Sequence, residues 1–172
     1  MSCDLKAILT DFLKGAARIA VLGVGSELRG DDGVGVAAAA EVERRLPRGR
    51  DVKVFQGHTA PENLSGAIKE FAPSHIVAVD TAPMGRKPGE VSVIDVDQVK
   101  GVSFYTHSLP LEVLFSYLRD ALPDLKVTIV GVEPGDMGFG KALSGDVSKA
   151  ADWVAGEIVA ALETLDFVKD SD

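Results

Sequence analysis

Two adjacent acids, a third acid and a histidine are spaced along the chain where they could bind a metal ion or activate water. Asp31 and Asp32 follow an apolar run through a short loop, Asp80 ends a second apolar run, and His107 lies in a polar stretch before a helical pattern. The carboxyl ends of parallel strands are where open α/β sheets bind ligands. Two carboxylates and one imidazole can form a three-ligand site with open positions. We therefore expect the side chains of Asp32, Asp80 and His107 to converge at one edge of the sheet, where the parallel strands end.

Each of these residues also has an ordinary structural explanation. Asp is a good N-cap, so one of the pair could simply cap the following helix, and Asp31 is the candidate for that or for supporting its neighbour. Asp80 could only satisfy nearby backbone amides, and a lone loop histidine such as His107 is often solvated. His58, in a Gly-His-Thr loop after another strand, is a rival ligand, whereas His75 begins a strand and is expected to be structural.

The order of elements predicts how these residues are positioned. Segments with apolar residues at helical spacing alternate along the chain with short apolar runs that are typical of buried strands. One further segment has apolar and polar residues in turn, which is typical of an edge strand. This alternation indicates a three-layer α/β/α sandwich. The expected strands are 19–24, 51–55, 75–80, 90–96 and 126–132, and the expected helices are 4–14, 34–46, 61–71, one from Pro110 and one from about 144 to 165.

Length and composition narrow the function classes. The 172 residues fit a single domain, 1–172, in which 1–18 form an N-terminal helical extension. The formal charge of -8 argues against nucleic acid and anionic membranes as partners. The single cysteine, Cys3, excludes an internal disulfide. No apolar run is long enough to span a membrane and no signal-peptide pattern opens the chain, so we expect a cytoplasmic protein without membrane insertion.

Several common catalytic and binding motifs do not fit the sequence. Gly23, Gly25 and Gly30 suggest a dinucleotide fingerprint, but four residues rather than two separate the last pair, and the second strand lacks a closing acid. The chain has no Gly-Lys-Ser/Thr phosphate loop, and Ser26 is not held in a Gly-x-Ser-x-Gly elbow. A small nucleotide-binding domain is thus a disfavoured alternative, as is catalysis by a serine or cysteine nucleophile.

The combined motifs resemble the hydrogenase maturation proteases, the endopeptidases that trim the C-terminus of [NiFe]-hydrogenase large subunits. The resemblance runs in order from about Ile19 to the final helix, and the Thr-His-x-x-Pro-Leu segment looks closest to the branch that processes the hydrogenase-3 type subunit. The segments that match the family pattern are Gly-Val-Gly-Ser-Glu-Leu-Arg-Gly-Asp-Asp-Gly-Val-Gly at 23–35, Gly-His-Thr-Ala-Pro-Glu at 57–62, Val-Asp at 79–80, Thr-His-Ser-Leu-Pro-Leu at 106–111 and Gly-Val-Glu-Pro at 131–134.

The resemblance implies a twisted, mixed five-stranded sheet with one antiparallel strand, which we assign to the edge strand 90–96. It also implies that Asp32, Asp80 and His107 recognise nickel that the substrate brings, so that the C-terminal segment of the large subunit precursor is cut only after nickel insertion. A nickel-binding maturation chaperone without enzymatic activity is the alternative on the same scaffold. Two positions depart from the family pattern: Ser26 replaces an Asn, and His58 replaces the second Gly of a Gly-Gly-Thr or Gly-Gly-Ser loop.

Overall fold

One mixed sheet lies at the centre of the computed structural model, which describes residues 4–46, 51–96 and 108–165. Within these residues the strand order is β2-β1-β3-β5-β4. The first four strands in this order are parallel, and β4 pairs antiparallel with β5 at the edge. The strands are β1 (Ile19–Val24), β2 (Val52–His58), β3 (His75–Thr81), β4 (Val91–Asp95) and β5 (Lys126–Val132).

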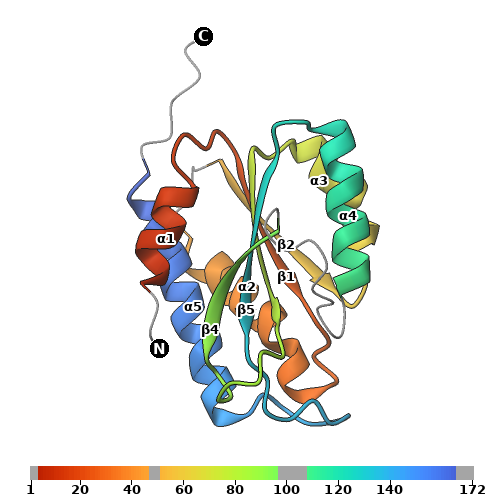
Figure 1. Cartoon of the computed structure of the whole chain (residues 1–172), viewed down its shortest axis with the longest axis vertical. Helices are drawn as coiled ribbons and strands as arrows, with labels where there is room; N and C mark the ends of the chain where they lie inside the picture. Colours follow the sequence, from red (N-terminus) through yellow and green to blue (C-terminus); the bar gives the residue numbers. More distant parts are fainter. Residues whose placement is uncertain (1–3, 47–50, 97–107, 166–172) are drawn as a thin grey trace.

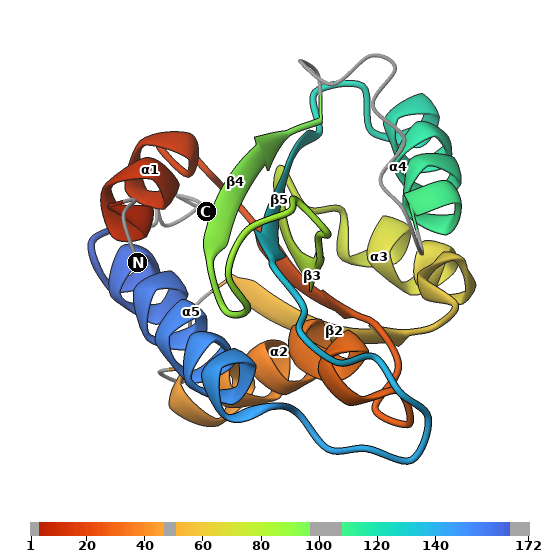
Figure 2. The ribbon, with the colours of Figure 1, turned by 60° about the horizontal axis from the view of Figure 1, so that its bottom comes forward.

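Helices cover both faces of this sheet (Figures 1 and 2). One face carries α1 (Leu5–Phe12), α2 (Val34–Arg45) and α5 (Gly145–Glu163), and the other carries α3 (Ser65–Phe71) and α4 (Ser108–Ala121). Two short 3-10 turns, η1 (Gly30–Gly33) and η2 (Pro61–Leu64), precede α2 and α3. The expected three-layer α/β/α sandwich is confirmed, as is the antiparallel edge strand.

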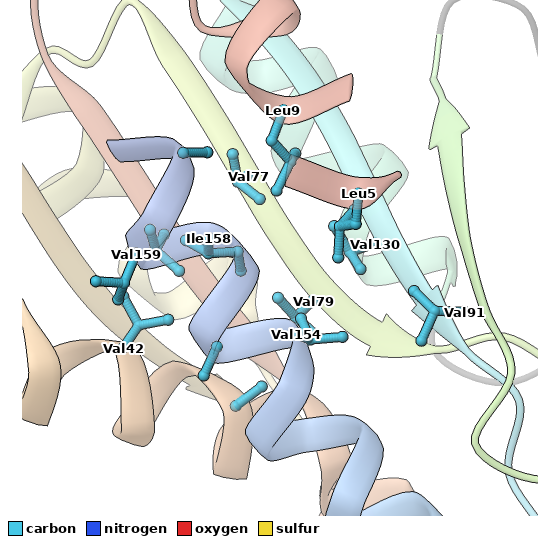
Figure 3. Close-up of a cluster of buried hydrophobic side chains, with 14 of the residues drawn as sticks. Leu5, Leu9, Val42, Val77, Val79, Val91, Val130, Val154, Ile158 and Val159 are labelled. Atoms are coloured by element: carbon cyan, nitrogen blue, oxygen red, sulfur yellow. The ribbon is translucent and has the colours of Figure 1, made fainter. Parts of the chain in front are cut away.

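Alternation along the central strands divides the core into two clusters. Val77 and Val79 of β3 face α1, α2 and α5, whereas Ile76 and Ala78 face α3 and α4. Side chains of a strand point to opposite faces in turn, so a strand buried on both faces must be apolar throughout. Every residue of β1 and β3 is buried. Figure 3 shows the first cluster, where Val154 and Ile158 of α5 meet these valines.

The N-terminal helix is part of this core. Leu5 and Leu9 of α1 are fully buried in the same cluster (Figure 3). Full burial of a leucine side chain contributes about 1.5–3 kcal/mol. Asp4 caps the helix by accepting a 3.0 Å hydrogen bond from the Ala7 amide. The segment before β1 therefore stabilises the α5 side of the sandwich.

Several element boundaries differ from the sequence prediction. The helix predicted from residue 61 begins as the 3-10 turn η2, the helix predicted from Pro110 begins at Ser108, and β2 continues past residue 55 to His58. No helix of the described chain is long and apolar enough to cross a membrane.

The strand order creates a topological switch point at the carboxyl ends of β1 and β3. The chain leaves β1 through α2 on one face and returns to β3 through α3 on the other, so the two strands are neighbours at a topological switch point. The first turn of α2 packs directly on these strand ends, where a Cβ on Gly35 would lie 2.1 Å from the Val79 carbonyl oxygen and 2.3 Å from that of Val24. Only glycine permits this approach, which brings the loop before α2 over the end of β3.

Candidate functional site

A threonine hydroxyl links Asp32 and Asp80 at this switch point. Asp32 belongs to η1 after β1, and Asp80 lies near the end of the adjacent parallel strand β3. The Thr81 Oγ1 atom lies 3.4 Å from Asp32 Oδ1 and 3.4 Å from Asp80 Oδ1. These two carboxylate oxygens are thus no further apart than twice that distance. The structure brings together two of the three site residues that the sequence predicts.

Backbone hydrogen bonds orient both carboxylates. Asp32 Oδ2 accepts from the Ser26 amide at 3.1 Å, and the Asp32 amide donates to the Arg29 carbonyl at 3.2 Å, which folds residues 26–32 into a closed turn. Asp80 Oδ1 accepts from the Thr81 amide at 2.7 Å. Both side chains are almost completely buried. A buried carboxylate is stable only when hydrogen bonds or a cation replace its hydration, and these amides supply part of that replacement.

The Asp31 carboxylate binds a different part of the chain from that of Asp32. Its Oδ1 accepts from the Ser144 amide at 2.6 Å, and its Oδ2 accepts from the Gly135 and Asp136 amides, both at 2.8 Å, and from the Ser144 hydroxyl at 2.9 Å. Burial alone would raise the pKa of Asp31, but the backbone amides of Asp136, Ser144 and Gly135 and the Ser144 hydroxyl outweigh it and lower the pKa below 3.8. Asp31 fastens the loop between β5 and α5.

The alternative that one acid of the pair caps the following helix is wrong. The N-cap of α2 is Gly33 and that of η1 is Arg29, and neither makes a side-chain capping hydrogen bond. Geometry explains the difference, because the carboxylate of Asp31 reaches amides of a distant loop and that of Asp32 reaches back to Ser26. Ser144 occupies the N-cap position of α5, but its hydroxyl donates to Asp31 instead of capping the helix.

Glu133 is a buried acid that the sequence reasoning did not single out. Its Oε2 accepts from the Met84 amide at 2.6 Å and from the Arg86 amide at 3.2 Å, so it holds the loop that leaves β3. The signal was present, because Glu133 directly follows β5 and Asp80 is the last residue but one of β3. Thr81, which bridges the site, was missed because a threonine at a strand end is unremarkable in sequence.

The histidines are placed as follows. His107, the third predicted site residue, lies outside the described residues, so its convergence with the two acids stays a prediction. His58 is the exposed last residue of β2 with φ 47°, and its Nδ1 lies 3.4 Å from Glu27 Oε2. His75 is buried at the opposite end of β3 from Asp80 and packs edge-on against Phe12, which agrees with its expected structural role.

The chemistry open to this arrangement is that of paired carboxylates at the carboxyl ends of two adjacent parallel strands. Two such groups can bind a divalent cation together with an imidazole, or one of them can accept a proton from water. In the described part of the chain, His, Cys, Asp and Glu side chains form no group of three or more that could hold a metal ion. The third donor that the sequence predicts, His107, is not among the residues that the structure describes.

Comparison with known proteins agrees with the fold and with the motifs. Residues 36–161 match the hydrogenase maturation protease family HycI. The chain is 34% identical to the hydrogenase 3 maturation protease of Escherichia coli K12 over 135 residues, which cover 78% of this chain and 84% of that protein.

Two solved structures extend the likeness to three dimensions. The crystal structure of a [NiFe] hydrogenase maturation protease HycI from Thermococcus kodakarensis superposes with a TM-score of 0.83 at 30% identity, covering 91% of this chain and 99% of that one. The maturating endopeptidase HybD of E. coli gives a TM-score of 0.73 at 28% identity, covering 85% and 92%. The expected resemblance is confirmed: the chain belongs to the hydrogenase maturation protease family.

Proposed function

We propose that this protein is a processing endopeptidase that removes the C-terminal extension of a [NiFe]-hydrogenase large subunit precursor after nickel insertion. In this proposal nickel arrives with the precursor, and Asp32, Asp80 and His107 recognise it. Cleavage then depends on metal insertion and acts as a check on assembly. The reaction takes place in the cytoplasm.

One observation carries the proposal: the hydroxyl of Thr81 lies 3.4 Å from an oxygen of each carboxylate, at the carboxyl ends of adjacent parallel strands. This is the position where open α/β sheets bind ligands. Two carboxylates and an imidazole offer oxygen and nitrogen donors, which suit a borderline divalent ion such as nickel. Membership of the protease family supports the peptide precursor as the substrate class.

Two hydrolytic routes are compatible with these residues. In one, the ion on the precursor polarises the attacking water or the scissile carbonyl, and the site residues orient it. In the other, a carboxylate of the site acts as general base and takes a proton from water. Both routes need the two carboxylates to be held in a fixed direction, which the amides of Ser26 and Thr81 favour.

The test is a mass measurement on a candidate large subunit precursor, incubated with the protein with and without nickel loading. We expect a shortened large subunit only from the nickel-loaded precursor. Asp80→Asn is the matched control, because it keeps the volume of the side chain and removes its charge. A precursor that is bound but remains intact would identify the chaperone alternative, and shortening without nickel would refute metal recognition.

A further inference from the structure

Two large apolar side chains are exposed on the loops that flank the site. Leu28, on the turn that ends at Asp32, is 65% exposed, and Phe139, on the loop between β5 and α5, is 81% exposed. The two loops run side by side at the bottom of Figure 1, and Figure 2 shows them together beyond the start of α2. The amide of Gly140 donates to the Leu28 carbonyl at 2.8 Å, so the backbones carrying both side chains are one hydrogen bond apart.

The loops are joined firmly, so these side chains are presented on a rigid support. The Gly30 amide donates to the Lys141 carbonyl at 3.1 Å, and the Asp31 amide donates to the Asp136 carbonyl at 2.9 Å. The backbones touch at Gly30, whose φ is 55° and where a Cβ would lie 2.3 Å from the Asp136 carbonyl oxygen. The ion pair between Asp136 and Lys141 closes the second loop on itself.

The charges around Leu28 and Phe139 indicate the kind of partner. In the turn that carries Leu28, the acids Glu27, Asp31 and Asp32 outnumber the single base Arg29, while the charges of Asp136 and Lys141 in the second loop cancel each other. The whole chain carries a formal charge of -8. A partner that covers the two apolar side chains and reaches the carboxylates is therefore complementary if it is apolar at one point and carries net positive charge.

We propose that Leu28 and Phe139 form a docking surface for the precursor polypeptide beside the scissile bond, where they hold an apolar side chain of a basic segment. This inference rests on the proposed function. Leu28 lies in the same hydrogen-bonded turn as Asp32, so a peptide that reaches the carboxylate pair passes this surface. Exposed aromatic and aliphatic anchors on a preorganised support are the usual source of binding energy at such contacts.

The experiment compares Leu28→Ser, Phe139→Ser and the double variant with the wild type in precursor shortening. Each single change should raise KM about tenfold and leave kcat within about twofold, because the surface binds the peptide without touching the reacting atoms. Ile8→Ser is the matched control, since Ile8 is 41% exposed on α1, away from these loops, and should change neither constant. KM of the wild type should also rise as salt increases from about 0.05 to about 0.5 M.

The outcomes separate this inference from the proposed function. Unchanged KM in the double variant, while the wild type shortens the precursor, overturns the docking surface and leaves the protease intact. Conversion of a wild-type dimer to a monomer by the double variant assigns the surface to self-association and also overturns it. If the wild type shortens no precursor, the protease proposal fails. In that case a tenfold loss of precursor binding affinity in the same variants would still support the docking surface.

Discussion

Replacing Asp31 by Asn should destabilise the fold strongly although Asn is nearly the same size. The carboxylate accepts four hydrogen bonds, one at Oδ1 and three at Oδ2, and every donor belongs to Gly135, Asp136 or Ser144. Asn has only one acceptor oxygen, so in either orientation its amino group faces at least one backbone amide. This outcome differs from the mild effect expected if Asp31 merely capped a helix.

The magnitude follows from these contacts. A lost hydrogen bond to a charged group costs about 1.5–3 kcal/mol, and the bonds that remain weaken to about half because the acceptor becomes neutral. Together they predict about 3–4 kcal/mol of lost unfolding free energy for Asp31→Asn. For a chain of this length, that loss lowers Tm by about 10 °C.

Asp32→Asn is the matched control on the adjacent residue. The Asn oxygen can accept from the Ser26 amide, and its amino group can donate to the Thr81 hydroxyl, so we expect a change within about 1 kcal/mol. Urea and thermal unfolding of both variants measure the difference. Equal stability of the two variants, or an Asp31→Asn protein as stable as the wild type, would refute the division of roles within the acidic pair.

The wild type and the Asp31→Asn variant also give a test that depends on pH. The pKa of Asp31 is lowered in the folded state, so its contribution is present above the ordinary value of 3.8 and disappears as the pH falls through the lower folded pKa. The stability gap between wild type and Asp31→Asn should therefore narrow below pH 3.8. A gap that widens in acid would contradict the assigned hydrogen bonds.

Three further predictions follow from the site and the core. Asp80→Asn and His107→Ala should each abolish precursor shortening while Tm stays nearly unchanged, as measured by mass spectrometry and thermal unfolding; full shortening by both would end the metal-recognition proposal. Thr81→Val, which removes the shared hydroxyl, should lower kcat/KM about tenfold, whereas Thr81→Ser should keep most of it; equal activity of the two would exclude a positioning role for the hydroxyl. Burial and the charge of Lys126 lower the pKa of His75 from 6.5 to about 4, so stability should fall by at most about 3 kcal/mol as the pH drops through that interval. Urea unfolding of a His75→Gln variant should show a flatter pH profile, and an unchanged profile would assign the loss to other groups.

Much of the architecture was readable from local patterns. Apolar runs and helical spacing predict the three layers, because burial on one or both faces dictates which residues an element can carry. Asp32 and Asp80 could be placed at one rim, since parallel neighbouring strands end at the same edge of a sheet. The contribution of His107 stays a prediction, because it lies beyond the described residues.

Tertiary structure alone decided what each carboxylate does. Asp31 and Asp32 are adjacent and chemically identical, but the partners of Asp31 lie 104 to 113 residues away, whereas Asp32 bonds to a turn six residues back. Thr81 became part of the site only because the strand pairing brings it to Asp32, 49 residues away. The apposition of Leu28 and Phe139 likewise depends on hydrogen bonds between two loops. Sequence periodicity reports which face of an element is buried, but it carries no information about which distant backbone amides a side chain will meet.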